Sequence, residues 1–451
     1  MNLFDGKRLP ASAFRLDAKG LRAARYSDKY FYNIALMLRR LSGAGYRYSG
    51  SNPAPQLEGM DLKRVAVGDV HVEMQWFPRR KPRALVAGVD KALAILQAAT
   101  GYFDSRGKWV STYKALEVWA APDGSVADYG GDPMKVTPVL KVRGRYRDFA
   151  VLETPTIGAL TRASRIATNV YEVLEAARGR TVLFFPARFD AHELQADDGY
   201  AYHLAVQRYN QDYAANLQPF VSTDAQAQHW EGRGGGTVAH AAISSFLGDL
   251  PELMLQFAAT LDPDVPRIAL VDFHNDCIRD SVYTMKAMFS RWMELTAQGR
   301  HDEARRYKLV GVRPDTAGEL RDFAVSATGD PHEDFGVTPR LVFAMREAMD
   351  NAWKEWNLPV EYEEHARKWC REVKIVATGG FTPQRIRWFE ERGAPVDIYG
   401  VGSHLLSNCK ACGTNTDYTA DVVRVRIGRR WVDLAKVGRQ ACENPALERV
   451  Q

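Results

Sequence analysis

The stretch Lys374-Ile375-Val376-Ala377-Thr378-Gly379-Gly380 contains the pattern that decides the fold: a short apolar run followed at once by a polar, glycine-rich loop. Helix-like segments such as residues 280–298 and 340–356 lie between further runs of this kind. Those runs are Val182-Leu183-Phe184-Phe185, Ile268-Ala269-Leu270-Val271, Leu309-Val310-Gly311-Val312 and Val396-Asp397-Ile398-Tyr399. Apolar strands that alternate with helices are typical of a parallel sheet, and this number of them predicts a β/α barrel.

The first 150 residues lack this alternation and predict a separate α+β domain. The predicted elements are a helix capped by Ser27 or Asp28, strands between Val65 and Trp76, a helical segment from Ala84 to Ala99, and a strand-turn-strand pattern over residues 116–142. A long apolar helix pattern from Ile157 toward Ala177 then opens the barrel-like domain, predicted at 151–405. The C-terminal segment 406–451 reads as strands, Val422–Ile427 and Trp431–Val437, that return to the N-terminal domain.

Composition limits the classes of function. The chain has 451 residues, 46% hydrophobic and 25% charged, as expected for a soluble globular protein. Lys and Arg exceed Asp and Glu only by 60 to 55, and the clusters Arg79-Arg80-Lys81 and Arg429-Arg430 are predicted to be solvated, so neither indicates nucleic-acid binding. The start, Met1 to Asp5, lacks the features of a signal peptide, and no apolar run approaches the ~20 residues that span a bilayer. We therefore expect a cytoplasmic protein without membrane contact.

Five cysteines in a chain of this size do not suggest a disulfide framework. Cys409-Lys410-Ala411-Cys412 is a lone Cys-x-x-Cys motif. It could supply half of a zinc site, but without a second pair we expect a reduced, structurally incidental pair.

The glycine run Arg233-Gly234-Gly235-Gly236-Thr237-Val238-Ala239-His240 leads into the apolar segment from Ala241 to Leu247. Glycines allow a backbone to approach a ligand closely, and an apolar run anchors the loop. A histidine placed here can change protonation state, or accept a phosphoryl group, near neutral pH. The stretch is a candidate catalytic loop, although a glycine turn before a buried element also has a purely structural interpretation.

Residues that follow the apolar runs should meet at the carboxyl-terminal mouth of a barrel. They are Arg188, His240, Asp272, Arg313, Asp315, Gly379, Gly380, Gly402 and Ser403. Arginines and backbone N–H groups bind phosphate, and carboxylates bind metal or sugar hydroxyls. Together these residues predict a site for a phosphorylated substrate with Mg²⁺.

The order of motifs resembles the nicotinate phosphoribosyltransferase family, the type II phosphoribosyltransferases that include the nicotinamide and quinolinate enzymes. The motifs, from about Ser27 onward, are Ser27-Asp28-Lys29-Tyr30-Phe31, Asp148-Phe149-Ala150-Val151-Leu152-Glu153-Thr154, Ser164-Arg165-Ile166-Ala167-Thr168, Gly236 to His240, Leu270-Val271-Asp272, Gly311 to Asp315, Val376 to Gly380, Tyr399 to Ser403 and Asp417-Tyr418-Thr419-Ala420-Asp421. The resemblance implies an incomplete α/β barrel with an N-terminal α/β sandwich completed by the C-terminal segment. It also implies a dimer with sites at the subunit boundary.

The implied reaction joins nicotinate to phosphoribosyl pyrophosphate, giving nicotinate mononucleotide and pyrophosphate, with Mg²⁺ and often with ATP hydrolysis. Carried over by position, Tyr30 would stack on the pyridine ring from the partner subunit and Phe185 would cover its other face. Arg188 would lie beside the carboxylate or the phosphates, and His240 matches the histidine that ATP phosphorylates. The resemblance further implies that Asp272 and Asp315 hold the ribose and the metal, and that Arg313 contacts the phosphates. The turns that bind the 5′-phosphate would contain Gly379, Gly380, Gly402 and Ser403.

Several positions depart from the family pattern. Asn33 and Glu172 stand where relatives often carry basic residues, and the segment from Phe189 to Phe220 is longer and more polar than the usual connection. Ser222, at the position that carries an aspartate in the nicotinamide enzyme, favours an acid substrate, whereas an alignment shift of two would place Asp224 there. A nicotinamide, quinolinate or other heterocycle transferase, and a catalytically silent nucleotide-binding homologue, therefore remain as alternatives.

Overall fold

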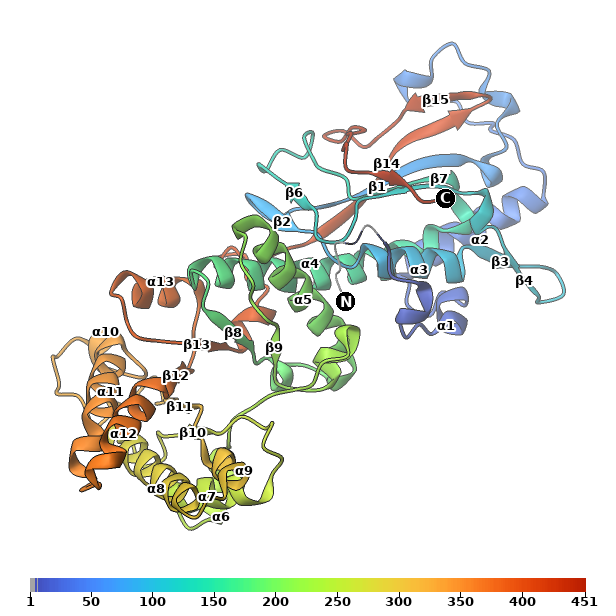
Figure 1. The fold of residues 1–451 in the computed structure, drawn as a ribbon. Helices are drawn as coiled ribbons and strands as arrows, with labels where there is room; N and C mark the ends of the chain where they lie inside the picture. Colours follow the sequence, from blue (N-terminus) through green and yellow to red (C-terminus); the bar gives the residue numbers. More distant parts are fainter. Residues whose placement is uncertain (1–4, 6) are drawn as a thin grey trace. The chain divides into compact units, whose positions relative to one another are not determined.

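The computed structural model describes residue 5 and residues 7–451 of the chain. The prediction that Met1 to Asp5 lack a signal peptide therefore falls mostly outside the described residues. The chain divides into two compact units (Figure 1). The first contains the residues up to 169 together with 201–208 and 407–451, and the second contains 170–200 and 209–406. Among the described residues, no helix has the length and apolar character needed to cross a membrane.

The first unit is built on a six-stranded antiparallel sheet in the order β15-β14-β1-β7-β5-β16. Its strands are β1 (His71–Pro78), β5 (Glu117–Ala120), β7 (Leu140–Arg145), β14 (Tyr418–Ile427), β15 (Arg430–Asp433) and β16 (Glu448–Arg449). The smaller pairs are β2 (Arg83–Leu85) with β6 (Val126–Asp128), and β3 (Gly101–Phe103) with β4 (Trp109–Ser111). The C-terminal strands therefore complete the N-terminal sheet, as predicted.

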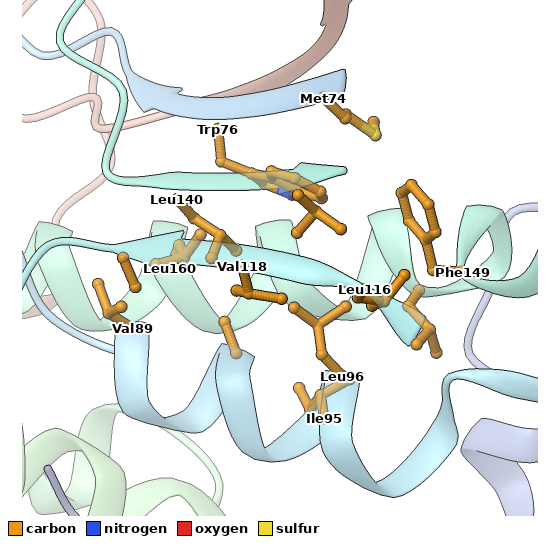
Figure 2. Close-up of a cluster of buried hydrophobic side chains, with 14 of the residues drawn as sticks. Met74, Trp76, Val89, Ile95, Leu96, Leu116, Val118, Leu140, Phe149 and Leu160 are labelled. Atoms are coloured by element: carbon orange, nitrogen blue, oxygen red, sulfur yellow. The ribbon is translucent and has the colours of Figure 1, made fainter. Parts of the chain in front are cut away.

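The core of this unit lies between the sheet and its helices, α1 (Ala18–Arg22), α2 (Lys29–Gly43), α3 (Val89–Ala99) and the start of α4 (Glu153–Ala176). Alternate residues of β1, Val72, Met74 and Trp76, point to this side, where Leu96 of α3 and Leu160 of α4 are fully buried (Figure 2). Burial of such apolar side chains supplies most of the stability of a unit of this size.

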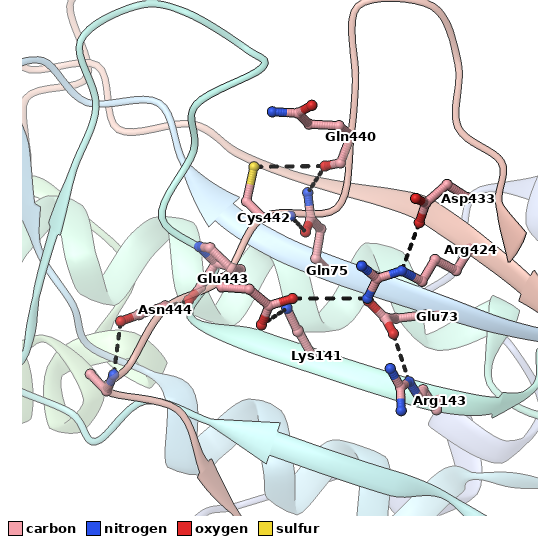
Figure 3. Close-up of polar contacts among 12 residues, drawn as sticks. Glu73, Gln75, Lys141, Arg143, Arg424, Asp433, Gln440, Cys442, Glu443 and Asn444 are labelled. Carbon is pink, nitrogen blue, oxygen red and sulfur yellow. Dashed lines mark hydrogen bonds and ion pairs between the residues drawn. The ribbon is translucent and has the colours of Figure 1, made fainter. Parts of the chain in front are cut away.

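The opposite face of the same sheet is polar, and the C-terminal segment covers it (Figure 3). Glu73 is 1% exposed and forms ion pairs with Arg143 at 2.6 Å and Arg424 at 2.9 Å. Gln75 donates to the backbone oxygen of Gln440 at 2.9 Å. A buried carboxylate is tolerated only when it is paired, so these contacts fix the C-terminal segment to the strand that the N-terminal part supplies.

The second unit contains a parallel sheet in the order β10-β11-β12-β13-β8-β9. Its strands are β8 (Thr181–Phe184), β9 (Phe220–Val221), β10 (Ile268–Leu270), β11 (Gly311–Arg313), β12 (Lys374–Ala377) and β13 (Ile398–Val401). The helices are α5 (Gln195–Tyr213, partly in the first unit), α6 (His240–Ser245), α7 (Leu250–Thr260), α8 (Cys277–Ala297), α9 (His301–Ala304), α10 (Pro331–Asp334), α11 (Pro339–Asn351), α12 (Val360–Glu372) and α13 (Pro383–Glu391). Within the described chain the edge strands β9 and β10 do not pair, so the barrel is incomplete, as the resemblance implies.

Several element boundaries differ from the prediction, as three examples show. Residues 84–99 form a strand and then a helix, because Gly88 takes a left-handed conformation (φ 86°) that separates β2 from α3. Residues 65–70 form short 3₁₀ turns, and β1 starts only at His71. Helix α2 begins after Asp28, but the Asp28 carboxylate accepts from the Thr154 hydroxyl at 2.9 Å and makes no capping bond.

Two expectations about polar residues were wrong. Arg80 is only 2% exposed, because its guanidinium donates to Asn169 Oδ1 at 3.1 Å and to the Thr416 hydroxyl at 3.2 Å. Arg429 and Arg430 are exposed, as predicted. Cys409 and Cys412 are joined in a disulfide rather than reduced, since the turn between them brings their Cα atoms to 5.2 Å.

Candidate functional site

The residues predicted to form a site in the second unit follow the carboxyl ends of parallel strands. Phe185 and Arg188 come after β8, Asp272 after β10 and Asp315 after β11. Gly379 and Gly380 follow β12, and Gly402 and Ser403 follow β13. Because the strands are parallel, their carboxyl ends lie along one edge of the sheet, which is where open α/β sheets bind ligands.

His240 and Asp272 form a direct pair. His240 is the first residue of α6, and its Nε2 lies 3.0 Å from each carboxylate oxygen of Asp272. The histidine side chain is 48% exposed, whereas the aspartate is 9% exposed. An acceptor on Nε2 places the ring proton there, so the Nδ1 atom of a neutral imidazole carries a free lone pair.

Charge at the buried end of this pair is unfavourable without a cation. Burial raises the pKa of Asp272, and His240 opposes that shift, while the nearby charge of Asp315 adds to it. A cation beside the two carboxylates would relieve this repulsion.

Arg313, the last residue of β11, is a buried cation. It is 5% exposed, and its guanidinium lies over the Phe185 ring at 5.6 Å. One terminal nitrogen reaches the Val238 backbone oxygen at 3.5 Å, and Nε has no hydrogen-bond partner within the described chain. Burial lowers the pKa of Arg313, and the charges of Asp315 and Asp272 partly offset that effect. A guanidinium held in this way is available for an anion.

A small pocket of about 90 Å³ brings most of the remaining predicted residues together. This is the volume of about three water molecules at ~30 Å³ each, which suits a group of phosphate size. It is lined by Phe185, Arg188, Phe189, Asp315, Thr378, Gly379, Gly380, Phe381, Gly400, Gly402 and Ser403. The predicted residues Phe185, Arg188, Asp315, Gly379, Gly380, Gly402 and Ser403 thus share one pocket.

Glycine is required in the wall of this pocket. Gly379 and Gly380 both have positive φ, 101° and 70°, so a side chain there would strain the backbone. A Cβ on Gly402 would lie 2.7 Å from the Phe189 ring. Next to them, the Thr378 hydroxyl donates to Asp315 Oδ1 at 2.6 Å and fixes the carboxylate.

Two glycines of the run before His240 pack closely against neighbouring parts of the chain. Neither Gly234 nor Gly235 has a positive φ, but a Cβ on them would lie 2.7 Å from the Thr223 backbone and 2.5 Å from the Phe220 ring. Asp224 accepts from the Gly234 amide at 2.8 Å, and the Ser222 hydroxyl donates to Gln226 Oε1 at 3.1 Å. Close approach to the end of β9 accounts for Gly234 and Gly235, and the role of the run in approaching a ligand stays a prediction.

The other flagged positions lie outside this pocket. Tyr30 belongs to the first unit, where it is 61% exposed in the first turn of α2. Asn33 is exposed on the same helix, and Glu172 lies in the later part of α4. The expected contact of Tyr30 with a partner subunit stays a prediction.

Asp272 and Asp315 are the residues that could hold a metal. No group of three or more His, Cys, Asp or Glu side chains in the described chain could hold an ion. Mg²⁺ is commonly held by one or two carboxylates with substrate phosphates and water completing its shell. The carboxylate pair therefore fits a cation that arrives with a phosphorylated substrate, and does not fit a permanent metal site.

Sequence reasoning omitted Phe189 and Phe381, which also line the pocket, whereas the other two lining residues, Thr378 and Gly400, belong to motifs already identified. Phe381 directly follows the Gly379-Gly380 turn after β12, so position after a strand was a usable signal for it. Nothing in the sequence pattern singled out Phe189, which enters the pocket through the 3₁₀ turn Ala187–Phe189.

Comparisons with known proteins agree with this architecture. The family described as quinolinate phosphoribosyl transferase, N-terminal domain, matches residues 61–164, while a search of curated protein sequences gives no match. The structure of nicotinate-nucleotide pyrophosphorylase from Pyrococcus furiosus is similar, with 21% identity, a TM-score of 0.60 and coverage of 97% of this chain and 85% of that chain. Human nicotinic acid phosphoribosyltransferase is similar at 16% identity, a TM-score of 0.53 and coverage of 89% and 75%. Residues 61–164 thus match the N-terminal domain of the quinolinate enzymes, and the whole fold is similar to that of these two structures, in agreement with the resemblance that the motifs indicate.

Proposed function

We propose that the protein is a phosphoribosyltransferase that joins nicotinate to phosphoribosyl pyrophosphate, giving nicotinate mononucleotide and pyrophosphate. The observation that carries the proposal is Arg313. It is a buried guanidinium beside two carboxylates, next to a phosphate-sized pocket with glycine walls. Two of the similar solved structures carry names of nicotinate-nucleotide enzymes.

In this reaction the pyridine nitrogen forms a bond to C1 of the ribose as the bond from C1 to the pyrophosphate oxygen breaks. Positive charge develops on the ribose, and negative charge on the leaving group. Asp272 and Asp315 would stabilise the first and Arg313 the second, because fixed charges in a partly buried site act more strongly than in water. The ring of Phe185 would hold the flat heterocycle, and Gly379, Gly380, Gly402 and Ser403 would bind the 5′-phosphate through backbone N–H groups.

Mg²⁺ fits this scheme as a substrate-borne ion on Asp272 and Asp315. When bound, it would supply charge neutralisation for the phosphates. We propose a homodimer in which Tyr30 of one subunit stacks on the heterocycle held by the other.

ATP coupling would act through His240. With Nε2 held by Asp272, the Nδ1 lone pair would attack the terminal phosphorus of ATP, forming an N–P bond as the bond to the ADP oxygen breaks. Asp272 would then stabilise the positive charge on the phosphorylated imidazole.

Pyrophosphate release by the purified protein tests the proposal, with Mg²⁺, phosphoribosyl pyrophosphate and one of nicotinate, nicotinamide or quinolinate, each with and without ATP. Release with nicotinate alone among the three is the expected result. Release with nicotinamide or quinolinate would reassign the heterocycle. If folded protein binds phosphoribosyl pyrophosphate but releases no pyrophosphate with any of the three, the chain is a catalytically inactive homologue, the alternative that Asn33 and Glu172 favour.

A further inference from the structure

The first unit contains a second cavity, unrelated to the strand ends of the parallel sheet. It has a volume of about 500 Å³ and lies between the segment 59–71 and the hairpin that joins β14 to β15. Small-molecule sites typically have volumes of about 300–1,000 Å³. The cavity is therefore large enough for a metabolite of nucleotide size.

Its charged lining is unbalanced toward positive. Arg64, Arg426 and Arg430 line it together with His71, Asp61 and Asp69. Asp61 is already paired with Arg64 at 2.9 Å. Asp69 is paired with two arginines of the same unit that lie outside the lining, Arg145 at 3.2 Å and Arg147 at 2.9 Å. Both acids are thus paired with arginines other than Arg426 and Arg430.

Arg426 and Arg430 differ from the other charged groups in the lining. Within the described residues, neither forms an ion pair or a side-chain hydrogen bond. His71 is half-buried beside Arg426, and burial together with the charges of Arg426 and Arg145 lowers the pKa of His71. A neutral imidazole can accept a hydrogen bond as well as donate one. Two unmatched guanidinium groups in a concave surface focus positive potential where a ligand would lie.

The rest of the lining is apolar. Met60, Val65, Val70 and Ile427 contribute side chains to the same cavity. An apolar wall beside two free guanidinium groups suits a ligand with a flat or apolar part and a phosphate, since arginine binds phosphate in a bidentate manner. A free inorganic ion would leave this wall unused.

We propose that this cavity, the arginine pocket, binds a small phosphorylated organic anion of nucleotide size. The lining belongs to the first unit alone, and the proposal does not depend on the phosphoribosyltransferase reaction.

The wall of the arginine pocket is rigidly attached to α2. The Ser42 hydroxyl at the end of α2 donates to Asp69 at 2.7 Å, and a Cβ on Gly68 would lie 2.3 Å from the Ser42 amide nitrogen. Binding in the pocket should therefore slow hydrogen exchange both in residues 59–71 and in the last turn of α2.

Isothermal titration with AMP tests the proposal, with inorganic phosphate and pyrophosphate as comparison ligands. The double variant Arg426→Ala/Arg430→Ala removes both unmatched cations. Arg429→Ala is the matched control, because Arg429 lies in the same exposed turn but outside the pocket lining. Arg313→Met disables the candidate site of the second unit and separates the two sites.

We expect AMP to bind the parent, Arg429→Ala and Arg313→Met proteins with similar affinity, and the double variant at least ~10-fold more weakly, since two charge-assisted contacts are lost. Equal unfolding temperatures of the double variant and Arg429→Ala would establish that the fold is intact. Slower hydrogen exchange of residues 59–71 in the parent protein when AMP is added is a second measurement that needs no variant. Three results would overturn the proposal: unchanged AMP affinity in the double variant, loss of AMP binding in Arg313→Met alone, or inorganic phosphate binding as tightly as AMP.

Discussion

Replacing Arg313 by methionine should weaken binding of phosphoribosyl pyrophosphate while leaving the fold intact. Methionine retains an unbranched apolar side chain of similar reach and removes only the guanidinium. Because the guanidinium is buried, lacks a close partner in the described chain and has a pKa lowered by burial, its charge does not favour the unliganded fold. Its loss should therefore cost little unfolding free energy.

The effect on the ligand should be large. A charge-assisted hydrogen bond contributes ~1.5–3 kcal/mol, so losing one raises the dissociation constant roughly 10- to 150-fold. Titration of phosphoribosyl pyrophosphate by calorimetry, and its KM in the pyrophosphate-release assay, would measure this change. Arg313→Lys should recover part of the loss, because lysine keeps the charge but not the planar fork.

Arg346 provides the matched control in the same unit. Its guanidinium donates to the backbone oxygens of Val373 at 2.7 Å and Cys370 at 2.6 Å, and it pairs with Asp350 at 2.6 Å. Arg346→Met should lower the unfolding temperature, because it leaves those carbonyls unsatisfied, and should leave ligand affinity unchanged. If Arg313→Met behaves like Arg346→Met, with lower stability and normal affinity, the assignment of Arg313 to the ligand is wrong.

Three further predictions concern other residues. His240→Ala should abolish stimulation of turnover by ATP and spare most basal turnover, as measured by pyrophosphate release; equal ATP stimulation in the variant and the parent would exclude a phosphohistidine. Burial, then the charges of Asp421 and Asp28, raise the pKa of Glu153 to about 8. The folded state thus binds the proton more tightly than the unfolded state, so the free energy of unfolding should fall as pH rises from about 4.5 to about 8. Glu153→Gln should flatten this pH dependence and raise the unfolding temperature at pH 8 by ~2–4 °C per kcal/mol relieved. An unchanged pH dependence in the variant would contradict the prediction. Alkylation of the denatured protein should label three cysteines before reduction and five after it, because Cys409 and Cys412 are joined; five before reduction would disprove the disulfide.

The parallel sheet was predictable because five of its six strands leave a local signal, the two-residue β9 being the exception. Runs such as Ile375-Val376-Ala377 are buried on both faces, so they are continuously apolar, and the polar residue that ends each run marks the functional edge. Asp272, Asp315 and the Gly379-Gly380 turn could therefore be assigned to one edge without coordinates. The antiparallel sheet left a weaker signal, since its polar face is covered by a segment more than 300 residues away, as in the bond from Gln75 to Gln440.

The errors arose where a distant residue decides the environment. A run of basic residues is normally solvated, and only the folded chain brings Asn169 and Thr416 to Arg80 and makes its burial possible. Ser222 is a different case, because its hydroxyl donates to the nearby Gln226 and its predicted role depends on a ligand. The spacing of residues in the sequence indicates which side chains lie near each other, but not which of them form hydrogen bonds with each other.

The charges in the second unit are arranged for a ligand that also carries charge. Arg313 lies close enough to Asp272 and Asp315 for each to influence the pKa of Arg313, yet no ion pair joins the arginine to either acid in the described chain. A fold selected for stability alone would bring these groups together, because a buried ion left unpaired is costly. Asp315 instead accepts a hydrogen bond from Thr378, and Asp272 is hydrogen-bonded to His240, so the carboxylates are engaged by groups other than the guanidinium. In the proposed reaction the ribose would face the carboxylates and the phosphates would face the arginine. The separation would then suit a transition state that carries both charges.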